Sequence, residues 1–231
     1  MLIAYMLAGA VAFSPAVSVA PIITEARFVE ELEHADLSYL KDTSVSIMGD
    51  SISTWIGKSI EGGSEAVYPD SEVQSYEQMW FGNLNVQQLS SVAGSYVTHR
   101  EDGEFVNFNS DTRVGFLGDS STVIIYGGTC DLLANVSVSD FESSLESLVS
   151  NVQYGDMRAT VLCTLPPIDH TNQDGDTYKE FNDSIRAVAD RTGSVLCEFE
   201  DAWEFSEISQ FTEDGVHPNA AGMARLSSVF D

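Results

Sequence analysis

A serine near the start of the chain and an Asp-x-x-His segment near its end are of residue types that can carry out nucleophilic catalysis. Ser51 lies in GDSIS directly after a short apolar run, and Asp214 precedes His217 by three residues in TEDGVHPN. An aspartate placed in this way on a turn can accept the Nδ1 proton of the histidine, which leaves Nε2 free to take the proton of a serine hydroxyl. Each segment alone is typical of an ordinary turn or helix cap, so the prediction requires the fold to bring them together.

The order and separation of these segments resemble those of the SGNH (GDSL-type) hydrolases, and the resemblance extends over roughly Ser44 to Phe230. It implies that Ser51 is the nucleophile, that His217 acts as general base and then as general acid, and that Asp214 orients His217. It also implies an acyl-enzyme intermediate and a reaction without a metal ion or an organic cofactor.

The resemblance further implies an oxyanion hole formed by the backbone N–H groups of Ser51 and of a glycine in the second sequence block. Gly94 in SSVAGSYV fits this block best because it follows a predicted strand, whereas the alternative, Gly82 in WFGNL, falls inside a helical pattern from Tyr76 to Leu84. The third block of the family reads Gly-x-Asn-Asp, and here IIYGGTCDL places Cys130 at the asparagine position, as a third and weaker member of the hole.

Cys130 weakens the predicted oxyanion hole, because a thiol donates a poorer hydrogen bond than an amide. Loss of one such donor lowers turnover by about 100 to 1000-fold in a comparable serine hydrolase. We therefore expect an ester hydrolase of reduced activity that acts on short acyl esters, such as acetyl groups on carbohydrates. Two alternatives stay open: a reactive thiol at Cys130, for which no base is evident, and a weak or inactive scaffold that binds glycans or takes part in a surface assembly.

Short apolar, β-branched runs alternate with helical patterns along the body of the chain, which indicates parallel strands joined by crossover helices. We expect a three-layer α/β/α sandwich with a central, mostly parallel five-stranded sheet, and the resemblance implies that this sandwich is flavodoxin-like. Ser53 and Thr54 would then lie in the first turn of the helix after the first strand.

Loops 56–75 and 166–177 follow the ends of predicted strands, where ligands bind in such sheets, and we expect them to form the walls of a pocket. The predicted strands are Ser44–Met48, Val86–Ser91, Thr122–Tyr126, Ala159–Thr164 and Ser194–Phe199, and the clearest predicted helices are Asp140–Val149 and Tyr178–Arg191.

The other histidines and the cysteines indicate no second site. His34 lies in an acidic helical pattern, and His99 and His170 lie in predicted loops, so we expect all three at the surface. The three cysteines lack CxxC spacing, which predicts neither a disulfide framework nor a zinc site. Cys163 and Cys197 are expected to be buried free thiols.

We expect one domain, residues 25–231, behind a hydrophobic segment of residues 1–24, because no Pro, Gly or Ser-rich linker divides the 231 residues. Met1 to Ala20 contain no charged side chain, which is typical of an export signal or a short membrane anchor, although no basic residue precedes them. A segment packed within the fold, or a piece of a longer protein, is the remaining alternative. This interpretation favours a secreted or cell-surface protein over a cytoplasmic one.

Acidic residues dominate the charge of the chain. The 36 Asp and Glu residues against 10 Lys and Arg residues give a net charge of -26. Such a surface repels phosphate backbones and anionic headgroups, so we expect a small-molecule or glycan ester as partner, with no nucleic acid and no membrane-surface binding by the domain. Two explanations of the charge stay open, a surface kept soluble by charge and adaptation to high salt. The oligomeric state is left open as well.

Overall fold

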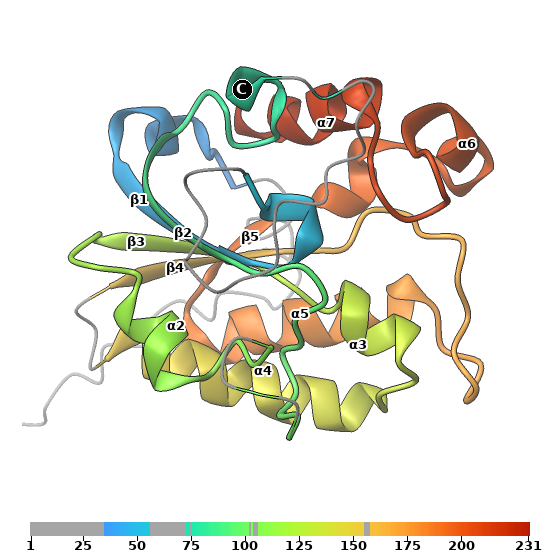
Figure 1. Ribbon diagram of the computed structural model, residues 1–231, viewed down its shortest axis with the longest axis horizontal. Helices are drawn as coiled ribbons and strands as arrows, with labels where there is room; N and C mark the ends of the chain where they lie inside the picture. The colour runs from blue at the N-terminus through green and yellow to red at the C-terminus, as the bar shows by residue number, and fades with distance from the viewer. Residues whose placement is uncertain (1–34, 56–72, 74, 102, 104–105, 155–157) are drawn as a thin grey trace, which may run out of the picture.

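The computed structural model describes residues 35–55, 73, 75–101, 103, 106–154 and 158–231. Five strands form one sheet in the order β2-β1-β3-β4-β5, and every neighbouring pair runs parallel (Figure 1). The carboxyl ends of the strands therefore meet at one edge of the sheet, with β1 between β2 and β3. The strands are β1 (Ser44–Gly49), β2 (Asn85–Ser91), β3 (Thr122–Tyr126), β4 (Ala159–Cys163) and β5 (Val195–Cys197).

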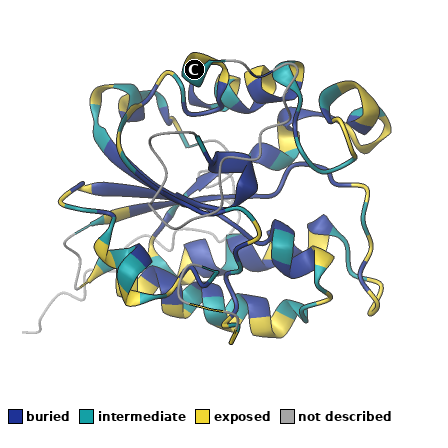
Figure 2. Cartoon of the chain, viewed as in Figure 1, coloured by how far each residue is buried: buried dark blue, intermediate teal, exposed yellow. Residues whose placement is uncertain are grey.

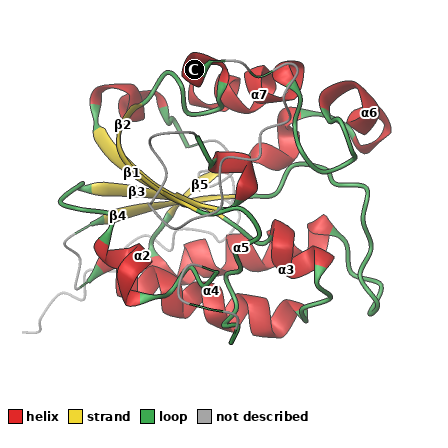
Figure 3. Ribbon diagram, in the orientation of Figure 1, coloured by secondary structure: helices red, strands yellow, loops and turns green. Residues whose placement is uncertain are grey.

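Helices cover both faces of the sheet, so the predicted three-layer α/β/α sandwich is confirmed (Figure 1, Figure 3). One layer contains α2 (Asp111–Gly115), α3 (Thr129–Leu133), α4 (Val138–Gln153) and α5 (Tyr178–Thr192), and the other contains α6 (Ile208–Phe211) and α7 (Ala220–Ser227). Short 3-10 helices span Ser38–Asp42, Ser51–Ser53, Tyr76–Gln78, Phe199–Ala202, Phe205–Glu207 and Ser228–Phe230.

The central strand of the sheet is apolar over most of its length and entirely buried. All five residues of β3 are buried because helices cover both faces of the sheet, and a parallel strand in this position is typically a continuous apolar run. Phe141 of α4 and Phe181 of α5 are fully buried, with ring centroids 4.8 Å apart. Figure 2 shows the buried residues in the sheet and on the inward helix faces, and the exposed residues on the outer helix surfaces.

Helix α5 begins at Tyr178, as predicted, and ends at Thr192, one residue beyond the predicted end. At its start Thr177 and Glu180 form a capping box, in which the Glu180 carboxylate accepts the Thr177 N–H at 2.7 Å. Its end is capped by Gly193 at φ +68°, a left-handed conformation that glycine adopts without strain. The helix also presents Asn182, whose amide accepts the Leu165 N–H at 2.7 Å and donates to the Leu165 carbonyl at 2.8 Å. This pair fixes the start of the loop that follows β4.

Apart from shifts of one residue, helix α4 extends beyond the predicted Asp140–Val149 at both ends, and two predicted elements are shorter in the structure than expected. The helix expected from Tyr76 to Leu84 is wrong, since only the 3-10 turn Tyr76–Gln78 forms there. At Gly82 the chain folds back so closely on Glu77 that a Cβ would lie 2.6 Å from the Glu77 carbonyl oxygen, and a continuous helix does not make this contact. The strand expected over Ser194–Phe199 is reduced to β5, because a 3-10 helix follows almost directly.

The structure tests the expectation for one of the three remaining segments and does not describe most of the other two. Loop 166–177 contains no helix or strand, as predicted. Segment 1–24 and, apart from residues 73 and 75, loop 56–75 lie outside the described residues. Among the helices that the structure describes, none is both long and apolar enough to span a membrane.

Candidate active site

The chain turns sharply after β1 and presents Ser51 at the carboxyl edge of the sheet. Asp50 caps the 3-10 helix that follows, because its Oδ1 accepts the N–H of Ile52 at 3.0 Å. Gly49 leaves room for this turn, since a Cβ there would lie 1.8 Å from the Ser53 hydroxyl oxygen. The backbone is thus held tightly on both sides of Ser51, which is 7% exposed.

The other hydroxyl groups of this turn form hydrogen bonds that stabilise it. Ser53 Oγ donates to the Asp50 carbonyl at 3.1 Å and accepts from Ser91 Oγ at 3.0 Å. Thr54 Oγ1 donates to the Ser51 carbonyl at 2.9 Å. Ser53 and Thr54 therefore stabilise the turn, whereas the Ser51 hydroxyl is directed to a partner from the far end of the chain.

Ser51, His217 and Asp214 form a continuous chain of hydrogen bonds. Ser51 Oγ lies 3.1 Å from His217 Nε2, and His217 Nδ1 lies 2.7 Å from Asp214 Oδ2. The other carboxylate oxygen of Asp214 accepts the N–H groups of Val216 at 3.0 Å and of His217 at 2.7 Å. With the proton on Nδ1, Nε2 can accept the serine proton, which is the arrangement that activates a serine. The structure brings together the three residues that the sequence singles out.

Asp214 is held in its ionised form. Partial burial alone would raise its pKa, but the backbone and ring hydrogen bonds from His217, the Val216 N–H and the nearby imidazole charge lower the pKa below its ordinary value. An ionised carboxylate in this position keeps the imidazole in one orientation and stabilises the imidazolium that forms when Nε2 takes a proton.

A closed turn holds the aspartate and the histidine of this chain together. The Glu213 N–H donates to the His217 carbonyl at 3.0 Å, and the Asn219 N–H donates to the Phe211 carbonyl at 2.9 Å. Gly215 lies at φ +85° within the turn, in the conformation that glycine tolerates best. Helix α7 begins directly after the turn. The relative position of the two side chains is therefore set by local backbone bonds.

Two buried charged residues, Asp50 and Arg113, lie behind the serine, and neither has an assigned role from the sequence. Arg113 Nη2 donates to the carbonyls of Gly49 at 2.7 Å and Ser90 at 2.5 Å. Its guanidinium also stacks on the Phe108 ring, 4.3 Å from the centroid. Because Gly49 ends β1 and Ser90 lies next to the end of β2, the arginine ties these strands together at the edge that carries the serine.

Burial raises the pKa of Asp50 to about 6, against the opposing effects of the Ile52 N–H, the His217 charge, the Thr129 hydroxyl and the Arg113 charge. When the pH is above this value, Asp50 is ionised and adds a second negative charge near the imidazole. Burial also lowers the pKa of Arg113 to about 9, and the Asp50 charge opposes this change. Asp50 can be singled out in the sequence, because it directly precedes Ser51 in GDS. Arg113 cannot, because it lies on a short helix that the sequence pattern does not predict.

A pH-dependent loss of stability is expected from the burial of Asp50. The unfolded chain releases this proton near the ordinary pKa of 3.8, and the folded chain holds it up to about pH 6. Between these values the folded state binds more protons, so the free energy of unfolding should fall as the pH rises through this window. Asp50→Asn keeps an acceptor for the Ile52 N–H and removes the charge, so at neutral pH the variant should be more stable than the wild type by up to about 3 kcal/mol.

Urea unfolding of the wild type and of Asp50→Asn between about pH 4 and pH 7 measures this effect. The difference between the two proteins should grow with pH and level off above the pKa of the folded state. A variant that is less stable than the wild type over the whole range would contradict the prediction, and would mean that the attraction between Asp50 and Arg113 outweighs the burial of both charges.

The structure places the two remaining oxyanion candidates, Gly94 and Cys130, against each other. Gly94, at φ +74°, lies in the tight turn after β2, and its N–H faces the sulfur of Cys130 in the first turn of α3. Asp131 joins these segments, since its carboxylate accepts the N–H groups of Val97 at 2.9 Å and Thr98 at 3.0 Å, and the Thr98 hydroxyl at 2.6 Å. Because β2 and β3 flank β1, both candidates lie at the edge that carries the serine.

Cys130 is a neutral thiol at ordinary pH. Burial raises its pKa, the charges of Asp50 and Asp131 raise it further, and only the Gly94 N–H acts in the opposite direction. A neutral thiol is a poor nucleophile and a weak hydrogen-bond donor, so this environment argues against the reactive-thiol alternative. Gly82, the alternative for the second block, precedes β2 and lies beside its amino end, so it does not belong to this edge.

The remaining histidines and cysteines take no part in this arrangement. His99 is exposed, as predicted, whereas His170 is half-buried rather than fully at the surface, and His34 lies outside the described residues. Cys163 and Cys197 are buried free thiols, as predicted. Within the described ranges no group of three or more His, Cys, Asp or Glu side chains is placed to hold a metal ion.

Comparison with known proteins shows which family model and which solved structures the chain is similar to. The model of the GDSL-like lipase/acylhydrolase family matches residues 47–225. No curated protein matches the chain. Among solved structures it is similar to a GDSL-like lipase candidate from Bacteroides ovatus, at 21% identity and a TM-score of 0.60 over 81% of this chain and 95% of that one.

Two esterases of known structure also share the fold. One is the psychrotrophic esterase EstA from Pseudoalteromonas sp., at 18% identity and a TM-score of 0.55 over 81% of this chain and 94% of that one. The other is a mutant of Axe2, an acetyl-xylooligosaccharide esterase from Geobacillus Stearmophilus, at 19% identity and a TM-score of 0.55 over 81% of this chain and 92% of that one. The family match runs from β1 through the turn with His217 into α7, and the chain therefore belongs to the GDSL-like lipase/acylhydrolase family.

Proposed function

We propose that this protein is a serine ester hydrolase that works through an acyl-enzyme, with Ser51 as nucleophile, His217 as general base and acid, and Asp214 as the residue that orients His217. The observation that carries the proposal is the unbroken chain of hydrogen bonds from Ser51 Oγ through both ring nitrogens to the Asp214 carboxylate. Membership in the GDSL-like lipase/acylhydrolase family supports ester hydrolysis in general.

In the proposed reaction Ser51 Oγ attacks the acyl carbon while its proton moves to His217 Nε2. The Ser51 N–H stabilises the developing oxyanion, together with the Gly94 N–H, which would leave the Cys130 sulfur that it faces in the free protein, and with the Cys130 thiol as a weak third donor. His217 then gives the proton to the oxygen of the departing alcohol, and the acyl group stays on Ser51 Oγ. Water repeats the attack with the same proton transfers and releases the acid.

Two carboxylates lie near the imidazole and can stabilise the positive charge that the ring gains when Nε2 takes the serine proton. Asp214 acts through a direct hydrogen bond, and buried Asp50 acts through its charge, because each interacts favourably with charged His217. The oxyanion and the imidazolium form together, so stabilising one supports the formation of the other.

Short acyl esters on carbohydrates, acetyl esters above all, are the substrates that we favour. The shared fold with an acetyl-xylooligosaccharide esterase supports this choice. A net charge of -26 also disfavours approach to anionic lipid surfaces, where a lipase with long-chain substrates would work.

A fluorophosphonate probe tests the proposed nucleophile. We expect stoichiometric labelling of the folded protein at Ser51, absent from Ser51→Ala, together with hydrolysis of p-nitrophenyl acetate by the wild type. Phosphonate chemistry suits this fold, since EstA from Pseudoalteromonas sp. is inhibited by monoethylphosphonate.

A scaffold that binds glycans without hydrolysing them is the second candidate, and the weak donor at Cys130 is the observation that favours it. If the folded protein, checked by circular dichroism, takes no label and hydrolyses no acetyl ester, the scaffold is supported and the esterase is wrong. Labelling without turnover would indicate an activated serine in a site that cannot stabilise the oxyanion.

A further inference from the structure

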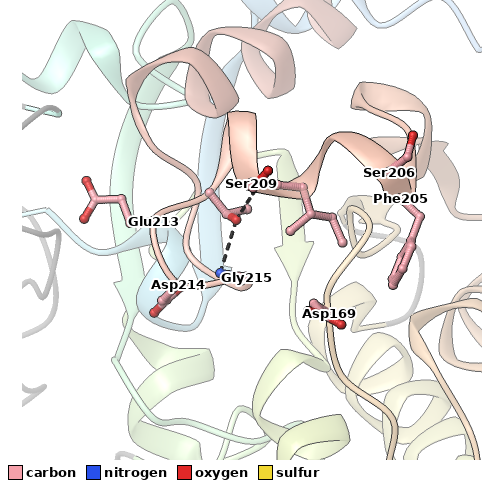
Figure 4. Close-up of a pocket in the computed structure, with 9 residues that line it drawn as sticks. Asp169, Phe205, Ser206, Ser209, Glu213, Asp214 and Gly215 are labelled. Carbon is pink, nitrogen blue, oxygen red and sulfur yellow. Dashed lines mark hydrogen bonds between the residues drawn. The ribbon is translucent and has the colours of Figure 1, made fainter.

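A pocket of about 420 Å³ opens beside the Asp214–His217 turn, between the loop after β4 and helix α6 (Figure 4). Asp214 and Gly215 belong both to the turn and to the pocket wall, so the pocket lies directly against the candidate triad. The two walls are joined where the Asp169 N–H donates to the Gly215 carbonyl at 3.1 Å. The lining includes Asp169, Phe205, Ser206, Ser209, Glu213 and Asp214.

An exposed aromatic ring stands at this pocket. Phe205 is 53% exposed, although large apolar side chains are otherwise mostly buried in the described part of the chain. The ring of Tyr178 stacks against Phe205, with centroids 6.3 Å apart and planes within 10° of each other. The Phe205 ring is therefore held in place without being covered. Such a ring offers a rigid apolar face to the C–H groups of a ligand ring.

Polar side chains also line this pocket. The hydroxyls of Ser206 and Ser209 can donate or accept hydrogen bonds, and the carboxylate of Asp169 can accept them from a ligand hydroxyl. In Figure 4 the Phe205 ring and the Asp169 side chain border the same opening, whereas Glu213 points away from them. A ligand that fits has several hydroxyl groups and an apolar ring face. The carboxylate and the net charge of -26 disfavour an anionic ligand.

The loop that carries Asp169 is fixed before any ligand binds. Asn182 bonds to both backbone groups of Leu165, at 2.7 Å and 2.8 Å. The indole N–H of Trp203 donates to the Pro167 carbonyl at 3.2 Å. A preformed wall reduces the entropy lost when a ligand is bound, and such walls are typical of small-molecule sites.

We propose that this pocket is a subsite for an unmodified sugar unit of a neutral glycan, next to the unit whose acyl group lies at Ser51. The inference rests on the proposed esterase function. Asp214 links the pocket to the triad, because it lines the pocket while its carboxylate lies 2.7 Å from His217 Nδ1, and His217 Nε2 lies 3.1 Å from Ser51 Oγ. The pocket then sets the preference for an oligosaccharide over a simple ester.

Phe205→Ala tests the subsite, and Tyr39→Ala is the matched control, because Tyr39 is an aromatic residue, 44% exposed, that does not line the pocket. Steady-state kinetics compare p-nitrophenyl acetate, which is too small to reach the subsite, with acetylated xylotriose. Phe205→Ala should lower kcat/KM for acetylated xylotriose about 10-fold, mainly through KM, and leave p-nitrophenyl acetate within about two-fold of the wild type. Tyr39→Ala should change neither value.

Binding of plain xylotriose, followed by NMR chemical-shift changes, separates the subsite from the chemistry. The wild type should bind it, and Phe205→Ala should bind it about 10-fold more weakly. Equal binding and equal kinetics in the two proteins would overturn the subsite and leave an esterase that cleaves p-nitrophenyl acetate. Binding that depends on Phe205, in a protein without esterase activity, would sustain the subsite and overturn the proposed function.

Asp169→Asn distinguishes a neutral sugar from a cation in the same pocket. The amide oxygen still accepts a bond from a sugar hydroxyl, so xylotriose binding should change by less than about three-fold. Hydrolysis of acetylcholine in preference to acetylated xylotriose, with a large loss in Asp169→Asn, would identify a cation site and overturn the glycan assignment.

Discussion

Replacing Ser51 with alanine should lower the rate of acetyl ester hydrolysis by about 10,000-fold or more while the protein stays folded. The reason is that Ser51 Oγ is the atom that lies 3.1 Å from His217 Nε2, and without it no acyl-enzyme can form. Its small, 7% exposed side chain fills little of the core, so the free energy of unfolding should change by less than about 1 kcal/mol. The initial rate with p-nitrophenyl acetate and a urea unfolding curve measure the two quantities.

Ser53→Ala is the matched control for this experiment. Its hydroxyl bonds to the Asp50 carbonyl and to Ser91, so its loss should cost about 1 kcal/mol of stability and leave most of the activity. If Ser53→Ala is inactive and Ser51→Ala retains activity, the nucleophile assignment is wrong.

Replacing Cys130 with asparagine should raise kcat by about 10 to 1000-fold, and should change KM much less. The thiol lies beside the Gly94 N–H at the edge that carries the serine, and its raised pKa keeps it neutral. An asparagine amide is the stronger donor, and a donor aimed at the oxyanion acts in the transition state rather than in the ground state. Kinetics with p-nitrophenyl acetate at saturating concentrations measure the change in kcat.

Cys130→Ala is the control, because a thiol that donates little should be replaceable with little loss of activity. The competing explanation is that Cys130 only packs at the start of α3. In that case the buried amide of Cys130→Asn would lack partners and lower the free energy of unfolding by about 1 to 3 kcal/mol. A variant that is less stable and no faster would remove Cys130 from the oxyanion hole.

The elements that the sequence predicts well are those whose pattern is local. The apolar run of β3 and the periodic pattern of α5 are visible in the chain, and the structure has β3 at the predicted residues and α5 within one residue of its predicted end. Helices α2 and α3 have five residues each, too few to show a periodicity. The pattern from Tyr76 to Leu84 misleads, because the fold-back at Gly82 depends on a tight backbone contact rather than on side-chain periodicity.

The candidate site likewise contains some residues that local sequence spacing predicts and others that it does not. Asp214 and His217 are three residues apart on one turn, so their pairing can be expected from spacing, and Ser51 is recognisable by its place after a strand. Arg113 cannot be found in this way, since its partners Gly49 and Ser90 are 64 and 23 residues distant along the chain. The pocket at Phe205 likewise combines a loop after β4 with a segment after β5, and no sequence spacing predicts their meeting.

The closed turn from Phe211 to Asn219 has a consequence for inactivation by heat. The turn is fixed by its own backbone bonds, whereas Ser51 belongs to the end of β1. One hydrogen bond of 3.1 Å joins the turn to Ser51, and one from the Asp169 N–H to the Gly215 carbonyl, also 3.1 Å, joins it to the loop after β4. The turn can thus move away from the sheet as an intact piece before either part melts. In native-state hydrogen exchange, the amides of Glu213 and Asn219 should then open together and at lower free energy than those of β1, so activity should disappear on heating before the cooperative unfolding transition.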